Sequence, residues 1–164
     1  MNYKKDVFLS VVCVIGSIVV ATIILSIAGC RQAHADNGLS YKDLPIPVKT
    51  IIGECANCTD DGMIAVGNVI RNRAEYRHQS FSEVCLAPNQ FSFWNDGSKT
   101  VQFIMSNREV WGRAYSAWQA SGTEDITDGA DYYFADYINP PSWSRKMRFT
   151  GCKIGHHLFY KDVK

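Results

Sequence analysis

The feature that most constrains this chain is an uncharged run from Val7 to Gly29, rich in valine, isoleucine and leucine and preceded by Lys4 and Lys5. As a helix rising about 1.5 Å per residue, such a run can cross a hydrocarbon core of roughly 30 Å. Basic residues before it favour an N-terminus that stays inside the cytoplasm. A buried helix of a soluble domain is the competing interpretation. We expect an exported protein in which everything after the run folds outside the cytoplasm.

Three fates of this segment remain open. Ile27 to Cys30 resembles a lipoprotein signal with lipid attached at Cys30, and Ala33 to Ala35 fits a cleavage site with small residues. The run could also stay as an inner-membrane anchor, which suits an endolysin, whereas lipid suits a resident remodelling enzyme. We predict a signal peptide or membrane anchor over residues 1–35, a linker over 36–46 and a catalytic domain over 47–164. The domain is periplasmic or otherwise extracytoplasmic in each case.

The composition of the 164 residues is that of an ordinary globular protein, with 46% hydrophobic and 20% charged positions. This length holds one catalytic core beside the N-terminal segment. The formal net charge is +1, and no run rich in lysine or arginine supplies a local field. Attraction to nucleic acid or to an anionic surface by charge is therefore excluded. We expect a monomer with no nucleic-acid partner.

Cysteine placement favours disulfides over metal binding. Cys13 and Cys30 belong to the N-terminal segment, and four further cysteines lie in the domain: Cys55, Cys58, Cys85 and Cys152. Four thiols in an oxidising compartment indicate two disulfides, for which three pairings are possible. The Cys-x-x-Cys spacing also suits a redox pair or half of a zinc site, but no second such motif follows. We expect disulfides, and no metal or cofactor.

Apolar periodicity predicts three helices. Pro45 and Pro47 open the first helix, which stops near Glu54. The second runs to about Arg73 with Asp60 or Asp61 as its cap. The third spans about residues 100–120. One face of it carries Trp111, Ala114, Tyr115 and Trp118, and Gly122 is placed to end it. We expect that aromatic stripe to pack in the core.

The rest of the chain predicts an ordered loop and a small sheet. Residues 76–97 have turn residues and aromatics without a clear period. Tyr132 to Phe134 is typical of a strand, Pro140 and Pro141 force a loop, and Lys153 to Tyr160 predicts a second strand. The fold class is therefore α+β, mainly helical, with a small antiparallel β-sheet.

Glu54 is the candidate catalytic residue. It stands in a Gly53-Glu54 step between an apolar stretch and the cysteine pair. A partly buried carboxyl group tends to keep its proton, and a protonated carboxyl can donate that proton to a glycosidic oxygen. An exposed glutamate at a helix end is the ordinary alternative at this spacing. No nucleophile elbow, phosphate-binding glycine loop or His-Glu-x-x-His motif offers other chemistry.

Several segments between Pro47 and Tyr160 carry a family resemblance through their order and spacing. They are Gly53-Glu54, the Gly62–Arg73 helix ending in Asn72-Arg73, Gln90-Phe91-Ser92, Gly129-Ala130 with Phe134, Trp143, and Ile154-Gly155-x-His157-x-Phe159-Tyr160. Together they resemble the SleB-type cell wall hydrolases of spore germination and of phage and bacterial envelopes. The resemblance implies a lysozyme-like or lytic transglycosylase-like fold, with a cleft between helices and a small sheet.

The resemblance also implies an activity and site residues. The substrate would be the glycan strand of peptidoglycan, cut between N-acetylmuramic acid and N-acetylglucosamine, with Glu54 as the catalytic acid. Gln90, Ser92 and Tyr133 would hold the sugars. His157 could bind substrate or assist proton transfer, although a histidine hydrogen-bonded to buried backbone is commoner.

One departure bears on the mechanism. The family often has a second acid four residues after the first, where this chain has Cys58. Hydrolysis needs a second carboxylate, and the sequence offers Asp60, Asp61 and Asp96, each of which also suits a cap or turn. With no partner in place, Glu54 could serve as acid and then as base. We therefore favour a lytic transglycosylase over a muramidase.

Two other functions compete with glycan cleavage. An N-acetylmuramoyl-L-alanine amidase, which cuts the peptide stem, usually needs zinc. The four histidines, His34, His78, His156 and His157, offer few ligands at suitable spacing for such a site. A non-catalytic peptidoglycan-binding envelope module, in which Glu54 is only structural, is the alternative from another class.

Overall fold

The computed structural model describes residues 40–95 and 107–163, which belong to one compact unit, Ser40–Lys164. Its elements run in the order η1 (Tyr41–Asp43), α2 (Ile46–Cys55), α3 (Asp60–Arg77), α4 (Phe81–Leu86), α5 (Ser92–Asn95), α7 (Arg108–Ala120), β1 (Tyr132–Ala135), η2 (Ser142–Lys146), β2 (Arg148–Ile154) and β3 (His157–Lys161). The predicted α+β class with dominant helices is confirmed. None of the described helices is long and apolar enough to cross a membrane, and the Val7–Gly29 run lies outside the described residues.

Helices α2 and α3 follow the sequence prediction closely. Helix α2 has Pro47 in its opening turn and ends one residue after Glu54. The predicted cap of α3 is wrong by one residue, because the side chain of Thr59 accepts the hydrogen bond from the Gly62 N–H. Asp60 and Asp61 lie in the first turn instead, where acidic groups favour the positive end of the helix dipole.

The segment predicted as a loop contains two short helices. Ser80 and Glu83 form a capping box that starts α4, and α5 follows at Ser92–Asn95. Both are too short to show an apolar period, which is why periodicity missed them. The Ser-x-x-Glu spacing was the one local signal for α4.

Helix α7 buries most of the predicted stripe. Trp111, Ala114 and Trp118 are buried, together with Ala117, whereas Tyr115 is 46% exposed and does not belong to the stripe. The helix ends at Ala120 with Ser121 as its C-cap in a right-handed helical conformation, and Gly122 follows directly, as expected, without a positive φ. The part of the expected helix before Asn107 lies outside the described residues.

The sheet has three antiparallel strands in the order β1-β3-β2. The predicted strand β1 is confirmed, but the single strand predicted over Lys153 to Tyr160 is wrong. The chain turns at Gly155 and His156, which divide that segment between β2 and β3. Gly155 has a φ of +57°, and a glycine with positive φ suits the first position of a two-residue hairpin loop.

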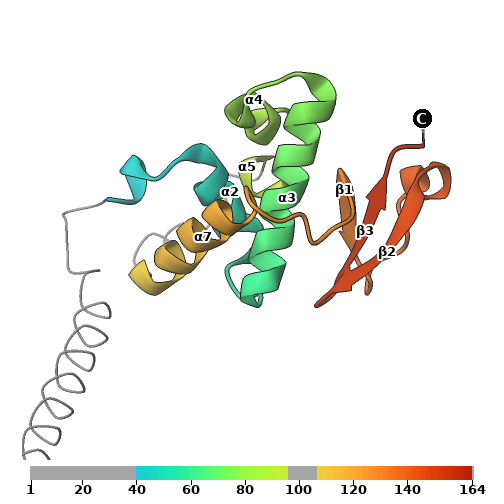
Figure 1. Ribbon diagram of the computed structural model, residues 1–164. Coiled ribbons are helices and arrows are strands. Elements are labelled where there is room, and N and C mark those ends of the chain that lie inside the picture. The colour runs from blue at the N-terminus through green and yellow to red at the C-terminus, as the bar shows by residue number, and fades with distance from the viewer. Residues whose placement is uncertain (1–39, 96–106, 164) are drawn as a thin grey trace, which may run out of the picture. The chain divides into compact units, whose positions relative to one another are not determined.

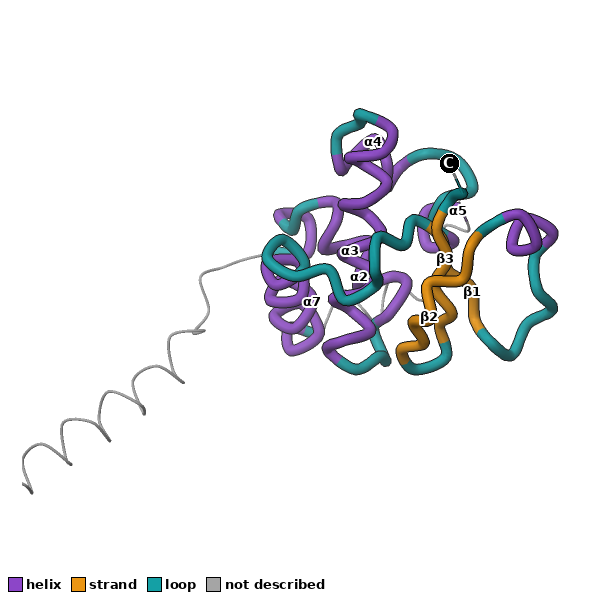
Figure 2. Tube along the Cα trace, turned by 45° about the vertical axis from the view of Figure 1, so that its right-hand side comes forward, coloured by secondary structure: helices purple, strands orange, loops and turns teal. Residues whose placement is uncertain are grey.

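Helix α3 lies between the other large helices and the sheet (Figures 1 and 2). One of its faces packs with α2 and α7 in a core that contains Ile51, Val66 and Trp111. On its other face, Ala65 and Val69 form a second core cluster with Ala130 and with Phe159 of the sheet. The sheet is therefore anchored to the helical part through α3.

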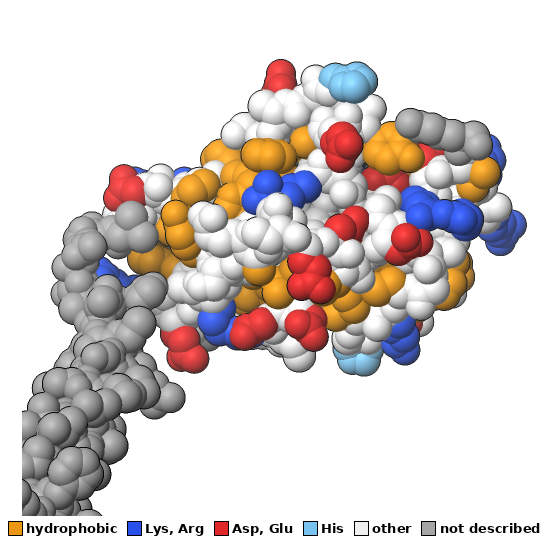
Figure 3. Space-filling model, viewed as in Figure 1, with side chains coloured by type: hydrophobic (Ala, Val, Ile, Leu, Met, Phe, Trp, Pro, Cys, Tyr) orange, Lys and Arg blue, Asp and Glu red, His pale blue; other side chains and the backbone are white. Residues whose placement is uncertain are grey.

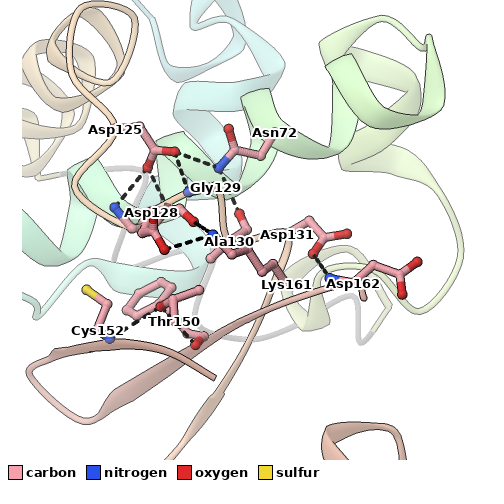
Figure 4. Close-up of polar contacts among 12 residues, drawn as sticks. Asn72, Asp125, Asp128, Gly129, Ala130, Asp131, Thr150, Cys152, Lys161 and Asp162 are labelled. Atoms are coloured by element: carbon pink, nitrogen blue, oxygen red, sulfur yellow. Dashed lines mark hydrogen bonds and ion pairs between the residues drawn. The ribbon is translucent and has the colours of Figure 1, made fainter. Parts of the chain in front are cut away.

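Polar side chains near the C-terminal end of α3 fasten the segment that leads into β1. Asn72 donates to the Ala130 carbonyl at 2.9 Å and to the Asp125 carboxylate at 3.1 Å. That carboxylate also accepts from the Gly129 N–H (Figure 4). Arg73 is buried and donates to the carbonyl of Asp131 at 2.6 Å. The Asn72-Arg73 pair thus positions β1 relative to α3.

Candidate active site

The Glu54 carboxylate lies where α2, α5 and β1 meet. One oxygen, Oε1, accepts from the Ser92 hydroxyl at 3.1 Å and from the Phe93 N–H at 2.8 Å. The other, Oε2, accepts from the Tyr133 hydroxyl at 3.2 Å. Glu54 is partly buried. Three donors from two distant segments therefore fix the direction of a side chain at the end of a helix.

Close packing explains how the four-residue helix α5 keeps its position. A Cβ atom on Gly53 would overlap the ring of Phe93, so only glycine lets α5 approach α2 this closely. Trp94 donates its indole N–H to the Thr50 hydroxyl at 2.9 Å. These contacts hold the Phe93 N–H on the Glu54 carboxylate.

Tyr133 supplies the donor from the sheet. It pairs with Phe159 across β1 and β3, and its ring contacts that of His157 at a centroid distance of 5.0 Å. Burial, followed by the negative charge of Glu54, raises the pKa of Tyr133 well above its usual value. The phenol therefore keeps its proton at neutral pH and can donate to Glu54.

His157 lies beside Tyr133 and the cysteine pair. A ring nitrogen of His157 and the sulfur atoms of Cys55 and Cys58 all lie within 4.8 Å of one another. Burial lowers the pKa of His157, which favours the neutral ring at neutral pH. His156 is exposed and contacts Asp136 at 3.1 Å. The two neighbouring histidines therefore have different surroundings.

Only one of the two expected disulfides is present. Cys55 and Cys58 are bonded, whereas Cys85 and Cys152 are free, so the expectation of a second bridge is wrong. Cys85 is buried in the core with α2 and α7, where burial raises its pKa to about 11. Cys152 packs on the sheet side with Phe159. The two thiols belong to different clusters, which prevents their pairing.

Gln90 has other partners than Glu54 in the structure. Its side-chain oxygen accepts from Arg77 at 2.9 Å, and its carbonyl accepts from Arg73 at 3.2 Å. The Gln90-Phe91-Ser92 segment thus brings only its serine to Glu54. Gln90 fastens the segment to α3.

The acids considered as a second carboxylate have other surroundings. Asp60 forms an ion pair with Arg113 at 2.8 Å, with 71% of its side chain exposed. Asp61 is exposed on the first turn of α3. Asp96 lies outside the described residues. Cys58, where the resemblance implies a second acid, is bonded to Cys55.

Two contributors to this site could not be predicted from residue types. The Phe93 N–H is a backbone donor, so the residue type does not predict its role. Its position depends on α5. Arg113 donates to the Cys58 carbonyl at 2.7 Å and so fastens the turn after Glu54 to α7. The Gly53 step was the visible signal, because a glycine in a helix often marks a close approach.

The surface carries no strong charge of one sign on the face shown in Figure 3. Acidic and basic side chains are interspersed there, with apolar side chains between them. This agrees with the formal net charge of +1. Binding of a polymer at this face would depend on shape and hydrogen bonds more than on a charged field.

Comparisons with known proteins agree with this arrangement. A solved catalytic domain of SleB from Bacillus cereus is 27% identical, with a TM-score of 0.56 over 77% of this chain and 94% of that chain. The catalytic domain of a germination-specific lytic transglycosylase, SleB from Bacillus anthracis, is 26% identical, with a TM-score of 0.58 over 77% of this chain and 100% of that one. No curated protein matches.

A family model described as Cell Wall Hydrolase matches residues 58–160. Glu54 lies just before the first matched residue, so its role depends on the geometry above. The matched region includes α3, α5, β1, β2 and all of β3 except its last residue. The chain therefore belongs to the cell wall hydrolase family, and it is a glycan-cleaving enzyme of the SleB type.

Proposed function

We propose that this protein cuts the glycan strand of peptidoglycan between N-acetylmuramic acid and N-acetylglucosamine as a lytic transglycosylase, with Glu54 as acid and then base. The observation that carries the proposal is the set of donors on the Glu54 carboxylate. Among the described residues, these donors are a serine hydroxyl, a backbone N–H and a phenol. All three are neutral. The carboxylate is thus oriented without being neutralised by a cation.

In the first step, protonated Glu54 gives its proton to the glycosidic oxygen as the bond from C1 of the muramic acid to that oxygen breaks. In the second step, the Glu54 carboxylate takes the proton of the primary hydroxyl of the same muramic acid. That hydroxyl oxygen bonds to C1 and closes an anhydro ring. No water is consumed, and Glu54 ends protonated as it began.

The hydroxyl groups beside Glu54 suit both protonation states. A hydroxyl can donate or accept depending on how its hydrogen is turned. Ser92 can therefore donate to the Glu54 carboxylate and accept from the protonated carboxyl. The Phe93 N–H can only donate, so it orients Oε1 in either state.

The neighbourhood of Glu54 supports the non-hydrolytic route. A retaining enzyme needs a second carboxylate at about 5 to 5.5 Å, and an inverting enzyme needs one at about 6.5 to 9.5 Å. Asp60 is engaged with Arg113, and Cys58 replaces the family's second acid. The similar chain from Bacillus anthracis is itself described as a lytic transglycosylase.

The residues around Glu54 have proposed roles in holding the glycan. Ser92 and Tyr133 contact Glu54, and in the proposed complex they touch the sugar at the scissile bond. His157 packs on Tyr133 and extends the same surface. Gln90 contributes by holding the start of α5 through Arg77.

The proposed substrate implies that the reaction takes place outside the cytoplasm. Peptidoglycan lies outside the cytoplasmic membrane, and the uncharged Val7–Gly29 run has the length of an export signal or anchor. We include export through this run in the proposal. The intact mass of the mature protein distinguishes cleavage, lipid attachment at Cys30 and a retained anchor.

The experiment is a digest of purified peptidoglycan with the wild type and with Glu54→Gln, followed by mass spectrometry of the soluble fragments. We expect anhydro-muramic ends from the wild type and a loss of release by on the order of a thousandfold in the variant. Asp61→Asn is the matched control, because Asp61 is an exposed acid nearby, and it should release the same fragments. Undiminished release by Glu54→Gln would remove Glu54 from the mechanism. Reducing ends from the wild type would contradict the transglycosylase.

A further inference from the structure

A second group of reactive side chains lies beside Glu54, and the proton transfers of the proposed glycan cleavage do not involve it. It consists of Cys55, Cys58 and His157, whose sulfur and ring nitrogen atoms lie within 4.8 Å of one another. Cys55 ends α2, Cys58 lies in the turn before α3, and His157 begins β3. Three segments therefore bring two sulfurs and one imidazole together.

These three residue types are ligands of soft and borderline metal ions. Zinc binds cysteine thiolates at about 2.3 Å and histidine nitrogen at about 2.0 to 2.1 Å. In a tetrahedral arrangement, ligand atoms at those lengths lie about 3.6 to 3.8 Å apart. The present separations of at most 4.8 Å between the nitrogen and the sulfurs need only a small closure. The bonded sulfurs would instead have to move apart.

We propose that reduction of the Cys55–Cys58 disulfide creates a zinc-type metal site from Cys55, Cys58 and His157, which the disulfide form lacks. A disulfide sulfur is no thiolate, and thiolates are the ligands that such metals require. The two states are therefore mutually exclusive. Three protein ligands leave one position for water.

The electron and proton balance of the change is simple. A dithiol reductant gives two electrons and two protons to the disulfide, whose S–S bond breaks to give two thiols, while the reductant closes its own disulfide. Metal binding then releases one proton from each thiol to water as two sulfur–metal bonds form. His157 contributes a nitrogen lone pair with no proton change when its ring is neutral.

The sulfurs adjoin the N-terminal end of α3. A Cβ atom built on Gly62 would lie 3.4 Å from the Cys55 sulfur and 3.5 Å from the Cys58 sulfur, so both sulfurs adjoin the first turn of α3. The positive end of a helix dipole stabilises a nearby thiolate. The Arg113 guanidinium, which donates to the Cys58 carbonyl, is paired with the Asp60 carboxylate, so its charge is offset.

The backbone of the turn is already closed by a contact that does not depend on the disulfide. The Cys58 N–H donates to the Cys55 carbonyl at 3.0 Å, and Arg113 ties the turn to α7. Reduction therefore breaks a covalent link within a turn that these hydrogen bonds still hold. The two thiols remain close enough to share one ion.

The test is a cobalt titration of the full chain after reduction with dithiothreitol and removal of the reductant without oxygen. Cobalt reports on its ligands through a thiolate charge-transfer band and the visible bands of a tetrahedral ion. We expect one equivalent to bind and to be displaced by zinc. The same protein without reduction should show no such band. A band of equal strength before reduction would overturn the proposal.

Variants assign the ligands. His157→Ala should weaken cobalt binding by about tenfold or more, and the neighbouring His156→Ala is its matched control, which should bind as the wild type does. Cys58→Ser should abolish the thiolate band, whereas Cys152→Ser should keep it. Equal affinities of the two histidine variants would remove His157 from the site. Loss of the band in Cys152→Ser would place the metal elsewhere.

The readout is independent of glycan cleavage. Far-ultraviolet circular dichroism of each variant shows whether it is folded, so weakened binding in a folded variant reports on the ligands. The cobalt spectra alone test the proposal, without a measurement of activity. Failure of the Glu54→Gln experiment would leave it untouched.

Discussion

The two ends of helix α3 serve different purposes. Near its C-terminal end, Asn72 and Arg73 are engaged with backbone carbonyls and hold the strand segment in place. Its N-terminal end adjoins the Cys55–Cys58 bridge, with His157 beside it. The Asn72-Arg73 motif was among the segments that carried the family resemblance, yet its contacts are those of a scaffold. The N-terminal end, beside Cys58, is the one with reactive side chains.

This contrast has a physical reason. A buried arginine that satisfies two carbonyls is costly to replace, because each carbonyl would be left without a partner. Side chains around a reacting carboxylate can vary as long as its direction and exposure are kept. Changes at the scaffold end should therefore reduce stability, and changes around Glu54 should reduce activity more than stability.

The largest effect is expected from Arg73→Met. This substitution removes donors from the carbonyls of Asp131 and Gln90 and should lower the free energy of unfolding by about 2 to 5 kcal/mol. Urea denaturation measures it. Arg145→Met, at an exposed position, is the control and should change stability by less than about 0.5 kcal/mol. Equal changes in the free energy of unfolding for both variants would show that Arg73 does not anchor the β1 segment.

Gly53→Ala should damage both stability and activity. The added methyl group overlaps the Phe93 ring, so α5 must shift, at a cost of about 1 to 3 kcal/mol. The shift also moves the Phe93 N–H away from Glu54. Gly112→Ala is a matched control in α7, because a Cβ atom there meets open space, and it should stabilise the helix by about 0.5 to 1 kcal/mol. Thermal unfolding and fragment release together test both variants.

Tyr133→Phe should lower the rate of fragment release about tenfold by removing one hydrogen bond from Glu54. Its stability should change little, since the ring still packs on Phe159. Tyr132→Phe, one residue earlier in β1, is the control and should keep full activity. If Tyr133→Phe were as active as the wild type, the phenol would have no part in orienting Glu54.

The smallest effect concerns pH. Burial lowers the pKa of His157 in the folded state, so the unfolded chain binds more protons between the folded and unfolded pKa values. Stability should therefore fall as the pH is lowered through about 6.5, the ordinary histidine value. Replacing His157 with glutamine should flatten this part of the stability curve, measured by urea denaturation at several pH values. The same change at His156 should leave the curve as it is.

The longer elements were predictable because they show a clear pattern. The buried positions of α2 and α3 recur at helical spacing, and the aromatic run at Tyr132 to Phe134 is typical of a strand. The hairpin between β2 and β3 was missed because its two-residue turn lies inside a run that alternates like one strand. Length and periodicity carry no information about such a turn.

The site could be predicted only in part from the sequence, for a related reason. Glu54, Ser92 and Tyr133 were expected together, and hydrogen bonds join them. The Phe93 N–H and the pairing of Cys55 with Cys58 depend on how distant segments approach. Gln90 matched the family pattern, but its side chain faces Arg77. A motif indicates which residues matter and leaves open which of them the chain turns toward the reacting group.

The central claim is that cleavage at Glu54 consumes no water, and a digest in water enriched in heavy oxygen tests it most directly. A transglycosylase closes the muramic acid on its own hydroxyl, so we predict released muramic ends that carry no heavy oxygen at C1 and weigh one water less than reducing ends. The digest should proceed equally well with a chelator present. Heavy oxygen at C1 of the muramic ends would show hydrolysis and contradict the account.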